Sequence, residues 1–320
     1  MYIIAIIAGL ILLFTGANYL TDGASSVSRR LRVSEFLIGV TVVAVGTSMP
    51  ELVVSVMSAA EGKSDVAIGN IVGSNIFNIY AILGITALCV PLVLTRTNIR
   101  RDVIICLAVS LWLTVISLDG TLWGGSENVI SRADGIVMLV LYGTFLWYMI
   151  RDGKLSGEAT TPSNETKPRS ETPLWLSLLM IAGGLAALIF GADIFLDGSI
   201  ELARRMGASE ATIAIILVAG GTSLPELAAT LISALKGKTD IAIGNILGSN
   251  IANILLILGI SSTIAPLRLG EIGWVDMLVM ISAVVAIWIS AYTLRRRKID
   301  RLEGVAFLVI YALYVWWLVG

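Results

Sequence analysis

Two glutamates stand in the same seven-residue motif, which occurs twice in the chain. Gly46-Thr-Ser-Met-Pro-Glu-Leu52 recurs 175 residues later as Gly221-Thr-Ser-Leu-Pro-Glu-Leu227. Glu51 and Glu226 are the only carboxylates well inside their apolar stretches, where a charge is costly and indicates a functional site. Neither motif holds a Lys or Arg that would neutralise its glutamate. Two such carboxylates facing each other would bind a cation.

Proline directly precedes each glutamate and is expected to break its helix. Pro50 has no N–H, so the carbonyl of Gly46 loses its helical donor, and the glycine weakens the helix further. Broken backbone at membrane depth persists only where it is buried or lines a cavity. The freed carbonyls are then available as cation ligands: those from about Ala44 to Thr47 and from about Ala219 to Thr222.

A second repeated pattern adds neutral oxygen atoms. Residues four positions apart share one face of a helix. Two such polar stripes occur: Asn70, Ser74 and Asn78, and then Asn245, Ser249 and Asn253. Glycines in the same segments, at Gly69 and Gly73 and again at Gly244 and Gly248, allow close helix approach. We expect this approach to bring each stripe against the neighbouring broken helix.

The predicted ligands are all oxygen atoms, which suit hard cations. Calcium takes about 6–8 oxygen ligands in flexible geometry, whereas Mg²⁺ demands a tight octahedron and resists dehydration. Two carboxylates neutralise one Ca²⁺ or two Na⁺. The same site can therefore hold either ion in turn, which is what exchange requires.

The composition excludes several other classes of protein. The chain has 320 residues, of which 57% are hydrophobic and 14% are charged, against about 45–50% and about 25% in soluble proteins. It has no histidine, which removes Ser–His and Cys–His catalysis and imidazole metal sites. Its two cysteines form no CxxC pair, and a net charge of −1 provides no basic field for nucleic acid. We expect no cofactor and no enzymatic activity.

Ten apolar stretches are long enough to cross a membrane as helices. They lie at about 2–21, 36–60, 66–92, 102–119, 133–150, 174–196, 209–235, 241–267, 273–294 and 302–319. They are too long for strands and lack sustained alternation of apolar and polar residues. The first stretch has no positive n-region and no evident cleavage site, so it is interpreted as a span and not as a signal peptide.

The repeat organises the whole chain. Segment 62–91 matches segment 237–266 at 19 of 30 positions. The expected organisation is a five-helix repeat at 1–150, a polar linker at 151–172 and a second five-helix repeat at 173–320. Because five is an odd number, the two copies take opposite orientations in the membrane. This inverted-repeat plan is typical of secondary transporters, whose site lies near the midplane between the copies.

Positive charges predict the orientation of the protein in the cell membrane. Of the 22 Lys and Arg residues, 17 fall on one side of the ten spans and five on the other. The positive-inside rule therefore places the central linker in the cytoplasm and both termini outside.

Both motifs together resemble the calcium/cation antiporter superfamily, and most closely the sodium/calcium exchanger branch of prokaryotic type with two alpha-repeats. The second motif reads Gly-Asn-Ile-x-Gly-Ser-Asn-Ile-x-Asn in each half. The resemblance implies that Glu51 and Glu226 bind Ca²⁺ and Na⁺. It implies further ligands at Thr47, Ser48, Ser74, Thr222, Ser223 and Ser249 and at the carbonyls of Ala44 and Ala219. It also implies that spans one and six slide past a core of the other eight.

Some relatives, among them potassium-cotransporting members, carry Asp at the position of Asn253, so the neutral side chain argues against potassium cotransport here. The leading interpretation is a Na⁺/Ca²⁺ antiporter. Its expected partners are the two ions and the lipid bilayer, and we expect no obligate protein partner. A Ca²⁺/H⁺ antiporter is the alternative within the superfamily, because one of two repelling carboxylates can take a proton. A cation channel is the alternative from another class, and it is disfavoured by inverted halves that share one central site.

Overall fold

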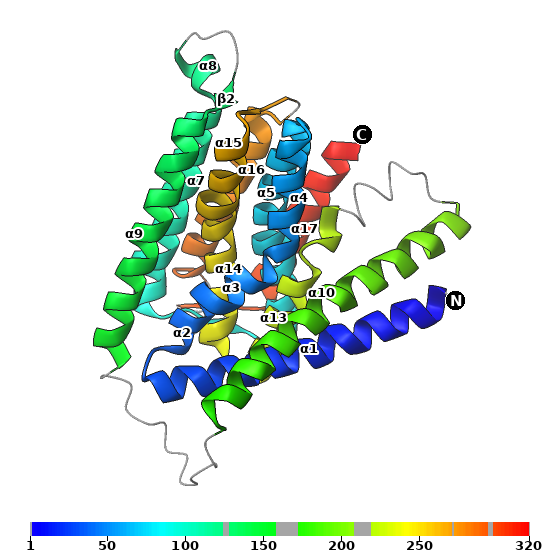
Figure 1. The fold of residues 1–320 in the computed structure, drawn as a ribbon, viewed down its shortest axis with the longest axis vertical. Coiled ribbons are helices and arrows are strands. Elements are labelled where there is room, and N and C mark those ends of the chain that lie inside the picture. Colours follow the sequence, from blue (N-terminus) through cyan, green and yellow to red (C-terminus); the bar gives the residue numbers. More distant parts are fainter. Residues whose placement is uncertain are drawn as a thin grey trace.

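The computed structural model describes residues 2–123, 128–157, 172–207, 219–270, 272–293 and 297–319, and in these ranges the chain is mostly helical (Figure 1). The first half comprises α1 (Tyr2–Leu31), α2 (Glu35–Ile38), the π-helical η1 (Gly39–Val43), α3 (Ala44–Thr47), α4 (Met49–Ala60), α5 (Ser64–Ile76), η2 (Phe77–Leu83), α6 (Gly84–Cys89), η3 (Asn98–Asp102), α7 (Val103–Ser117), α8 (Asp119–Trp123) and α9 (Arg132–Gly157). The second half comprises α10 (Leu174–Arg205), α12 (Ala219–Gly221), α13 (Leu224–Leu235), α14 (Thr239–Ala252), η5 (Asn253–Leu258), α15 (Gly259–Ile264), α16 (Trp274–Ser290) and α17 (Arg301–Val319).

Helices of the expected kind occur in every predicted apolar stretch. Among the described residues, six are long and apolar enough to cross a membrane, and the bent α2–α4 segment is a seventh. The other three stretches contain the shorter helices α7, α13 and α16. For α13, residues 209–218 of the predicted span lie outside the described residues. The all-helical polytopic fold is therefore confirmed, while α9 continues to Gly157, beyond the residue 150 expected for the end of the first repeat.

Both proline motifs interrupt their helices as predicted. α3 ends at Thr47 and α4 begins at Met49, with a bend of 49° between the two parts of the span. In the second half α12 ends at Gly221 and α13 begins at Leu224. Pro50 and Pro225 lie in the first turns of α4 and α13, where the missing N–H removes no helical hydrogen bond.

Helices α1 and α10 form a long antiparallel pair beside the remaining helices (Figure 1). Glycines allow the two backbones to touch: a Cβ added at Gly16 would lie 2.7 Å from the carbonyl oxygen of Gly184, and one at Gly9 would lie 2.6 Å from the backbone nitrogen of Phe195. Because the contacts run in opposite directions along the two helices, equivalent helices of the two halves point opposite ways. This is the geometry that an inverted repeat requires.

Helices α5 and α14 lie at the centre of the main hydrophobic core. α14 packs against the broken span through Gly244 and Gly248, whose added Cβ atoms would lie 2.7 Å from the carbonyl oxygen of Phe36 and 2.6 Å from the Cα of Val40. The close approach predicted for these glycines is therefore confirmed. The residues equivalent to Phe36 and Val40 in the second half lie in 208–218, so the matching prediction for Gly69 and Gly73 falls outside the described residues.

Two short antiparallel ladders join the halves outside the helices. β1 (Leu92–Val93) pairs with β4 (Lys298–Ile299), and β2 (Val129–Ile130) pairs with β3 (Leu267–Arg268). Each ladder takes one strand from each half of the chain, so the loops tie the two repeats together at both ends of the bundle.

Candidate cation-binding site

Both motif glutamates are completely buried. Glu51 and Glu226 have 0% exposed surface, and each lies in the first turn of the helix that follows the break. Free backbone N–H groups at a helix N-terminus carry partial positive charge and favour an ionised carboxylate. The break therefore serves two purposes: it places the carboxylate in the interior, and it points the positive end of a helix at it.

Serines from the opposite half hold one oxygen of each carboxylate. Ser48 Oγ donates to Glu226 Oε1 at 2.8 Å, and Ser223 Oγ donates to Glu51 Oε1 at 2.9 Å. Ser74 Oγ adds a bond of 3.4 Å to Glu51 Oε1 and lies 3.2 Å from Ser223 Oγ. The two motifs are thus interlocked, and the structure brings these predicted residues into one cluster.

The other carboxylate oxygens have no hydrogen-bond partner. Nine buried side-chain oxygen atoms lack a partner among the described residues, and five of them belong to predicted ligands: Glu51 Oε2, Asn78 Oδ1, Thr222 Oγ1, Glu226 Oε2 and Asn253 Oδ1. Buried polar atoms are normally satisfied, so each exception requires an explanation. A cluster of unsatisfied oxygen acceptors is the arrangement that a bound cation would complete.

Charge supports the same interpretation. Within the described ranges, Lys and Arg form salt bridges with other carboxylates, such as Glu35, Glu61 and Glu201. The two buried glutamates are neighbours, because each accepts a hydrogen bond from the serine three residues before the other. Removing an ionised carboxylate from water costs several kcal/mol unless an opposite charge compensates it. The site therefore favours a cation with two positive charges, or two cations with one each.

Two asparagines fix the backbone beside the glutamates. Asn70 Nδ2 donates to the carbonyl oxygen of Glu51 at 3.2 Å, and Asn245 Nδ2 donates to that of Glu226 at 3.4 Å. Asn70 also donates to Ser55 Oγ, and Asn245 to Thr230 Oγ1. The predicted contact between each polar stripe and the neighbouring broken helix is present. Ser55 and Thr230 were missed by the sequence analysis, although they occupy equivalent positions 175 residues apart.

The remaining predicted ligands lie around the first break. Thr47 Oγ1 donates to Asn245 Oδ1 at 3.2 Å, and Ser249 Oγ donates to the carbonyl oxygen of Ala44 at 3.4 Å. The carbonyl of Ala44 is not free as expected, because it also accepts the backbone N–H of Ser48 at 3.1 Å. Helix α3 keeps its helical hydrogen bonds up to the break. The role of the Ala44 carbonyl as an ion ligand therefore stays a prediction. Ala219 begins α12, and the residues before it lie outside the described ranges.

Helix α10 lies across both breaks. A Cβ added at Gly46 would lie 2.6 Å from the side chain of Leu185, and one at Gly221 would lie 2.8 Å from that of Leu196. One long helix of the α1–α10 pair thus covers both halves of the site. A shift of this helix would act on both breaks together.

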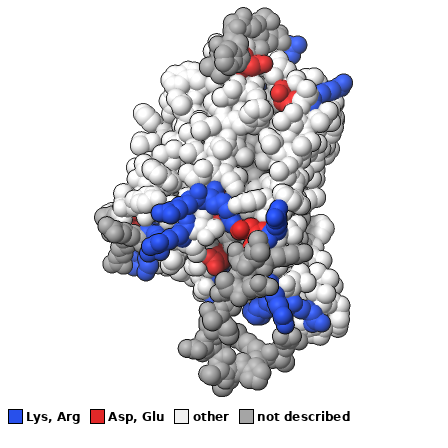
Figure 2. All heavy atoms as spheres, turned by 90° about the vertical axis from the view of Figure 1, so that its left-hand side faces the viewer, with Lys and Arg blue, Asp and Glu red and all other residues white. Residues whose placement is uncertain are grey.

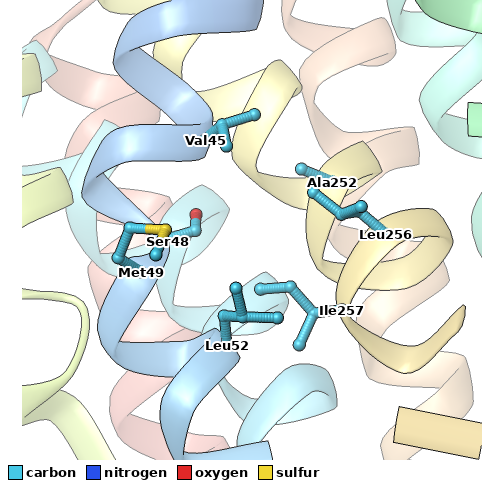
Figure 3. A pocket seen from close by; sticks show the side chains of 7 residues that line it. All are labelled: Val45, Ser48, Met49, Leu52, Ala252, Leu256 and Ile257. Atoms are coloured by element: carbon cyan, nitrogen blue, oxygen red, sulfur yellow. The ribbon is translucent and has the colours of Figure 1, made fainter. Parts of the chain in front are cut away.

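A small apolar pocket opens beside Ser48 (Figure 3). Side chains from the first break face the end of α14 and η5 across it: Val45, Ser48, Met49, Leu52, Ala252, Leu256 and Ile257. The residue equivalent to Ala252 in the first half is Phe77, whose ring lies 3.6 Å from the position of a Cβ at Gly220. The two halves of the site therefore differ in how closely they are packed beside the serine.

Comparisons with known proteins agree with this architecture. The sequence matches the sodium/calcium exchanger protein family over residues 1–151 and 176–320. It is 36% identical to the putative antiporter CaxA of Alkalimonas amylolytica, over 97% of this chain and 96% of that protein. It is 31% identical to the sodium/calcium exchanger MaX1 of Methanosarcina acetivorans, over 97% of this chain and 96% of that protein. Solved structures of the sodium-calcium exchanger NCX_Mj superpose with a TM-score of 0.81 at 30% identity, over 98% of this chain and 97% of that chain.

The match to this family covers nearly the whole chain, including both glutamate motifs. Its members are transporters and not enzymes, and the several apolar helices make this chain a multi-pass membrane protein. The chain belongs to the sodium/calcium exchanger family and is a cation/Ca²⁺ antiporter.

Proposed function

We propose that the protein exchanges Na⁺ for Ca²⁺ at a single site near the membrane midplane, between Glu51 and Glu226. The observation that carries the proposal is the pair of fully buried carboxylates, each with one oxygen held by a serine of the opposite half and one oxygen without a partner. The unpartnered oxygens of Asn78, Thr222 and Asn253 supply further neutral ligands.

The charge of the site explains why exchange is favoured over simple binding. Two ionised carboxylates are neutralised by one Ca²⁺ or by two Na⁺. An empty site leaves two like charges buried without compensation, and this state is costly. The protein therefore changes conformation most readily when it is loaded with one ion or the other, which couples the two fluxes.

The distribution of positive charge supports an orientation with the linker in the cytoplasm. Lys and Arg gather toward the lower end of the face shown in Figure 2, the end at which α1 and α9 terminate, and few lie near the top. This agrees with the split of 17 to five counted from the sequence. In this orientation an inward Na⁺ gradient would drive Ca²⁺ out of the cell.

Proton coupling is the second candidate, and one observation favours it. Glu51 and Glu226 are fully buried, and each accepts a hydrogen bond from the serine three residues before the other. The two carboxylates are therefore neighbours, and their like charges repel each other. A proton on one of them would relieve that repulsion, so a proton is able to replace Na⁺ as the counter-ion.

Flux measurements distinguish the two driving ions. Purified protein is reconstituted into liposomes loaded with Na⁺, and ⁴⁵Ca²⁺ uptake is measured with choline outside and no pH gradient. We expect rapid uptake that vanishes when the internal Na⁺ is replaced by choline. Uptake that ignores Na⁺ but follows an imposed pH gradient would contradict Na⁺ coupling and select the proton. Liposomes containing the Glu51→Gln variant measure the background leak.

A further inference from the structure

Four asparagine side chains form a closed set of hydrogen bonds where α5 and η2 meet α14 and η5. Asn75 and Asn250 face each other, and the side-chain Nδ2 of each donates to the backbone carbonyl of the other at 3.3 Å. Asn78 Nδ2 donates to Asn250 Oδ1 at 3.0 Å, and Asn253 Nδ2 donates to Asn75 Oδ1 at 3.1 Å. All four residues are at most 1% exposed. The bonds are reciprocal, so the pseudo-two-fold axis of the repeat passes between Asn75 and Asn250.

These bonds decide which end of two amides faces the candidate site. An asparagine amide presents an oxygen acceptor on one side and an NH₂ donor on the other. Because the NH₂ groups of Asn78 and Asn253 are engaged by Asn250 and Asn75, their oxygens point away, and both oxygens are buried without a partner. Asn78 lies one helical turn beyond Ser74, which bonds to Glu51.

The reverse orientation would be unfavourable at both ends of the amide. If Asn253 were flipped, its oxygen would face the oxygen of Asn75, and its NH₂ group would face the cation. Asn75 and Asn250 are themselves fixed by the backbone carbonyls that accept their Nδ2 hydrogens. Each of them therefore presents an oxygen, and only an oxygen, to its partner amide.

We propose that Asn75 and Asn250 are positioning residues of the cation site: by accepting the NH₂ groups of Asn253 and Asn78, they force the amide oxygens of these two residues toward the ion. This inference rests on the proposed cation-binding function, and it assigns the two residues a role that does not require contact with the ion. The assignment is crossed between the halves, since Asn75 orients Asn253 and Asn250 orients Asn78.

The crossed assignment predicts a specific pattern of rescue. In Asn75→Ala the acceptor for Asn253 is lost, and the amide is free to turn its NH₂ group toward the cation. A carboxylate at position 253 presents an oxygen in either orientation, so N253D removes the need for Asn75. The oxygen of Asn75 would even repel the carboxylate at position 253. A carboxylate at position 78 gives no such relief, because Asn75 does not orient Asn78.

The test measures Ca²⁺ affinity by isothermal titration calorimetry on purified full-length protein in Na⁺-free buffer. Substitution of residues that orient metal ligands typically weakens metal binding by about 10–100-fold. We expect N75A to weaken Ca²⁺ binding at least about tenfold in the wild-type and N78D backgrounds, and not to weaken it in the N253D background. The mirror variant N250A, which is measured independently if N75A does not fold, should be rescued by N78D and not by N253D.

Equal weakening by N75A in all three backgrounds would overturn the inference, because a residue that only supports helix packing would give that result. Unchanged affinity of N75A in the wild-type background would also overturn it. If the wild-type protein binds no Ca²⁺, the proposed function itself fails, and this inference fails with it. Binding by the wild type with no crossed pattern refutes the positioning role alone.

Discussion

Replacing Glu51 by Gln keeps the shape of the side chain and removes one of the two negative charges of the site. Ser223 Oγ still has an oxygen acceptor at the position of Oε1, to which it donates at 2.9 Å in the native protein. The oxygen that has no partner, Oε2, becomes an NH₂ group. The substitution therefore changes the charge and one ligand atom of a completely buried residue, and the same reasoning applies to Glu226.

The size of the effect follows from charge and burial. Unit charges about 4 Å apart attract by about 4 kcal/mol at an effective dielectric constant of about 20, so Ca²⁺ gains about 8 kcal/mol from each carboxylate. The amide that replaces the carboxylate is still a polar ligand and recovers part of that gain. The net loss is roughly 4 kcal/mol, which corresponds to about a thousandfold weaker Ca²⁺ binding. For Na⁺ the gross attraction is half as large, so Na⁺ binding should weaken much less.

Thermal unfolding of the purified protein with and without Ca²⁺ provides the assay. A ligand at about 100 times its Kd stabilises the folded state by about 2.7 kcal/mol. We expect a Ca²⁺-dependent rise in Tm for the wild type and none for Glu51→Gln or Glu226→Gln at the same Ca²⁺ concentration. In cation-free buffer both variants should be at least as stable as the wild type, because the repulsion between the two carboxylates is gone.

The matched control is Glu61→Gln, at the far end of α4. Glu61 is exposed and pairs with Lys63 at 2.7 Å, and exposed pairs contribute only about 0–1 kcal/mol. This variant should keep the Ca²⁺ response and the ⁴⁵Ca²⁺ flux of the wild type. Retention of both the Ca²⁺-dependent rise in Tm and the flux by either glutamine variant would refute the assignment of the site.

Three further predictions concern the rest of the molecule. In a variant without native cysteines, a cysteine introduced at Asn164 should react with a membrane-impermeant reagent only after cells are opened, whereas one at Gly320 should react in intact cells; the reverse pattern would invert the orientation. Gly184→Ala should strongly reduce flux, because its Cβ would lie 2.7 Å from the backbone nitrogen of Leu20. The substitution Gly183→Ala at the neighbouring exposed glycine should leave flux unchanged. Equal flux in the two variants would argue that transport does not depend on the close packing of α1 against α10. Ca²⁺ flux in Na⁺-loaded liposomes should not require K⁺ and should fall at acidic pH, where protons compete for the two glutamates; a requirement for K⁺ would refute the interpretation of the neutral Asn253.

The positions of the spans and of the two breaks followed from the sequence because they depend on local properties. Stretches of apolar residues dictate helices in a membrane, since every backbone polar group must be satisfied within the chain. Proline removes a donor wherever it stands, so the break before Glu51 could be located to within a few residues. The internal repeat required an inverted arrangement, and the antiparallel pairing of α1 with α10 agrees with it.

The types of the candidate ligands were also evident from the sequence, but the contacts that they make with one another were not. Helical periodicity places Asn70, Ser74 and Asn78 on one face of a helix without saying which other helix lies against that face. The structure shows that Ser48 holds Glu226, from the other half of the chain, and does not bond to Glu51 in its own motif. The expectation that Ala44 presents a free carbonyl did not allow for the helical bond that continues up to the break.

The amino-acid sequence by itself determined the membrane class, the two inverted halves, the broken helices and the two buried carboxylates, because each depends on composition or on neighbours within one helix. Tertiary structure alone decided the crossing of the two halves: the reciprocal serine–glutamate bonds, the paired Asn75 and Asn250, and the position of α10 over both breaks. The serine–glutamate and asparagine contacts join residues more than 170 positions apart. Their geometry is set by how whole helices pack, and no pattern within a single helix encodes it.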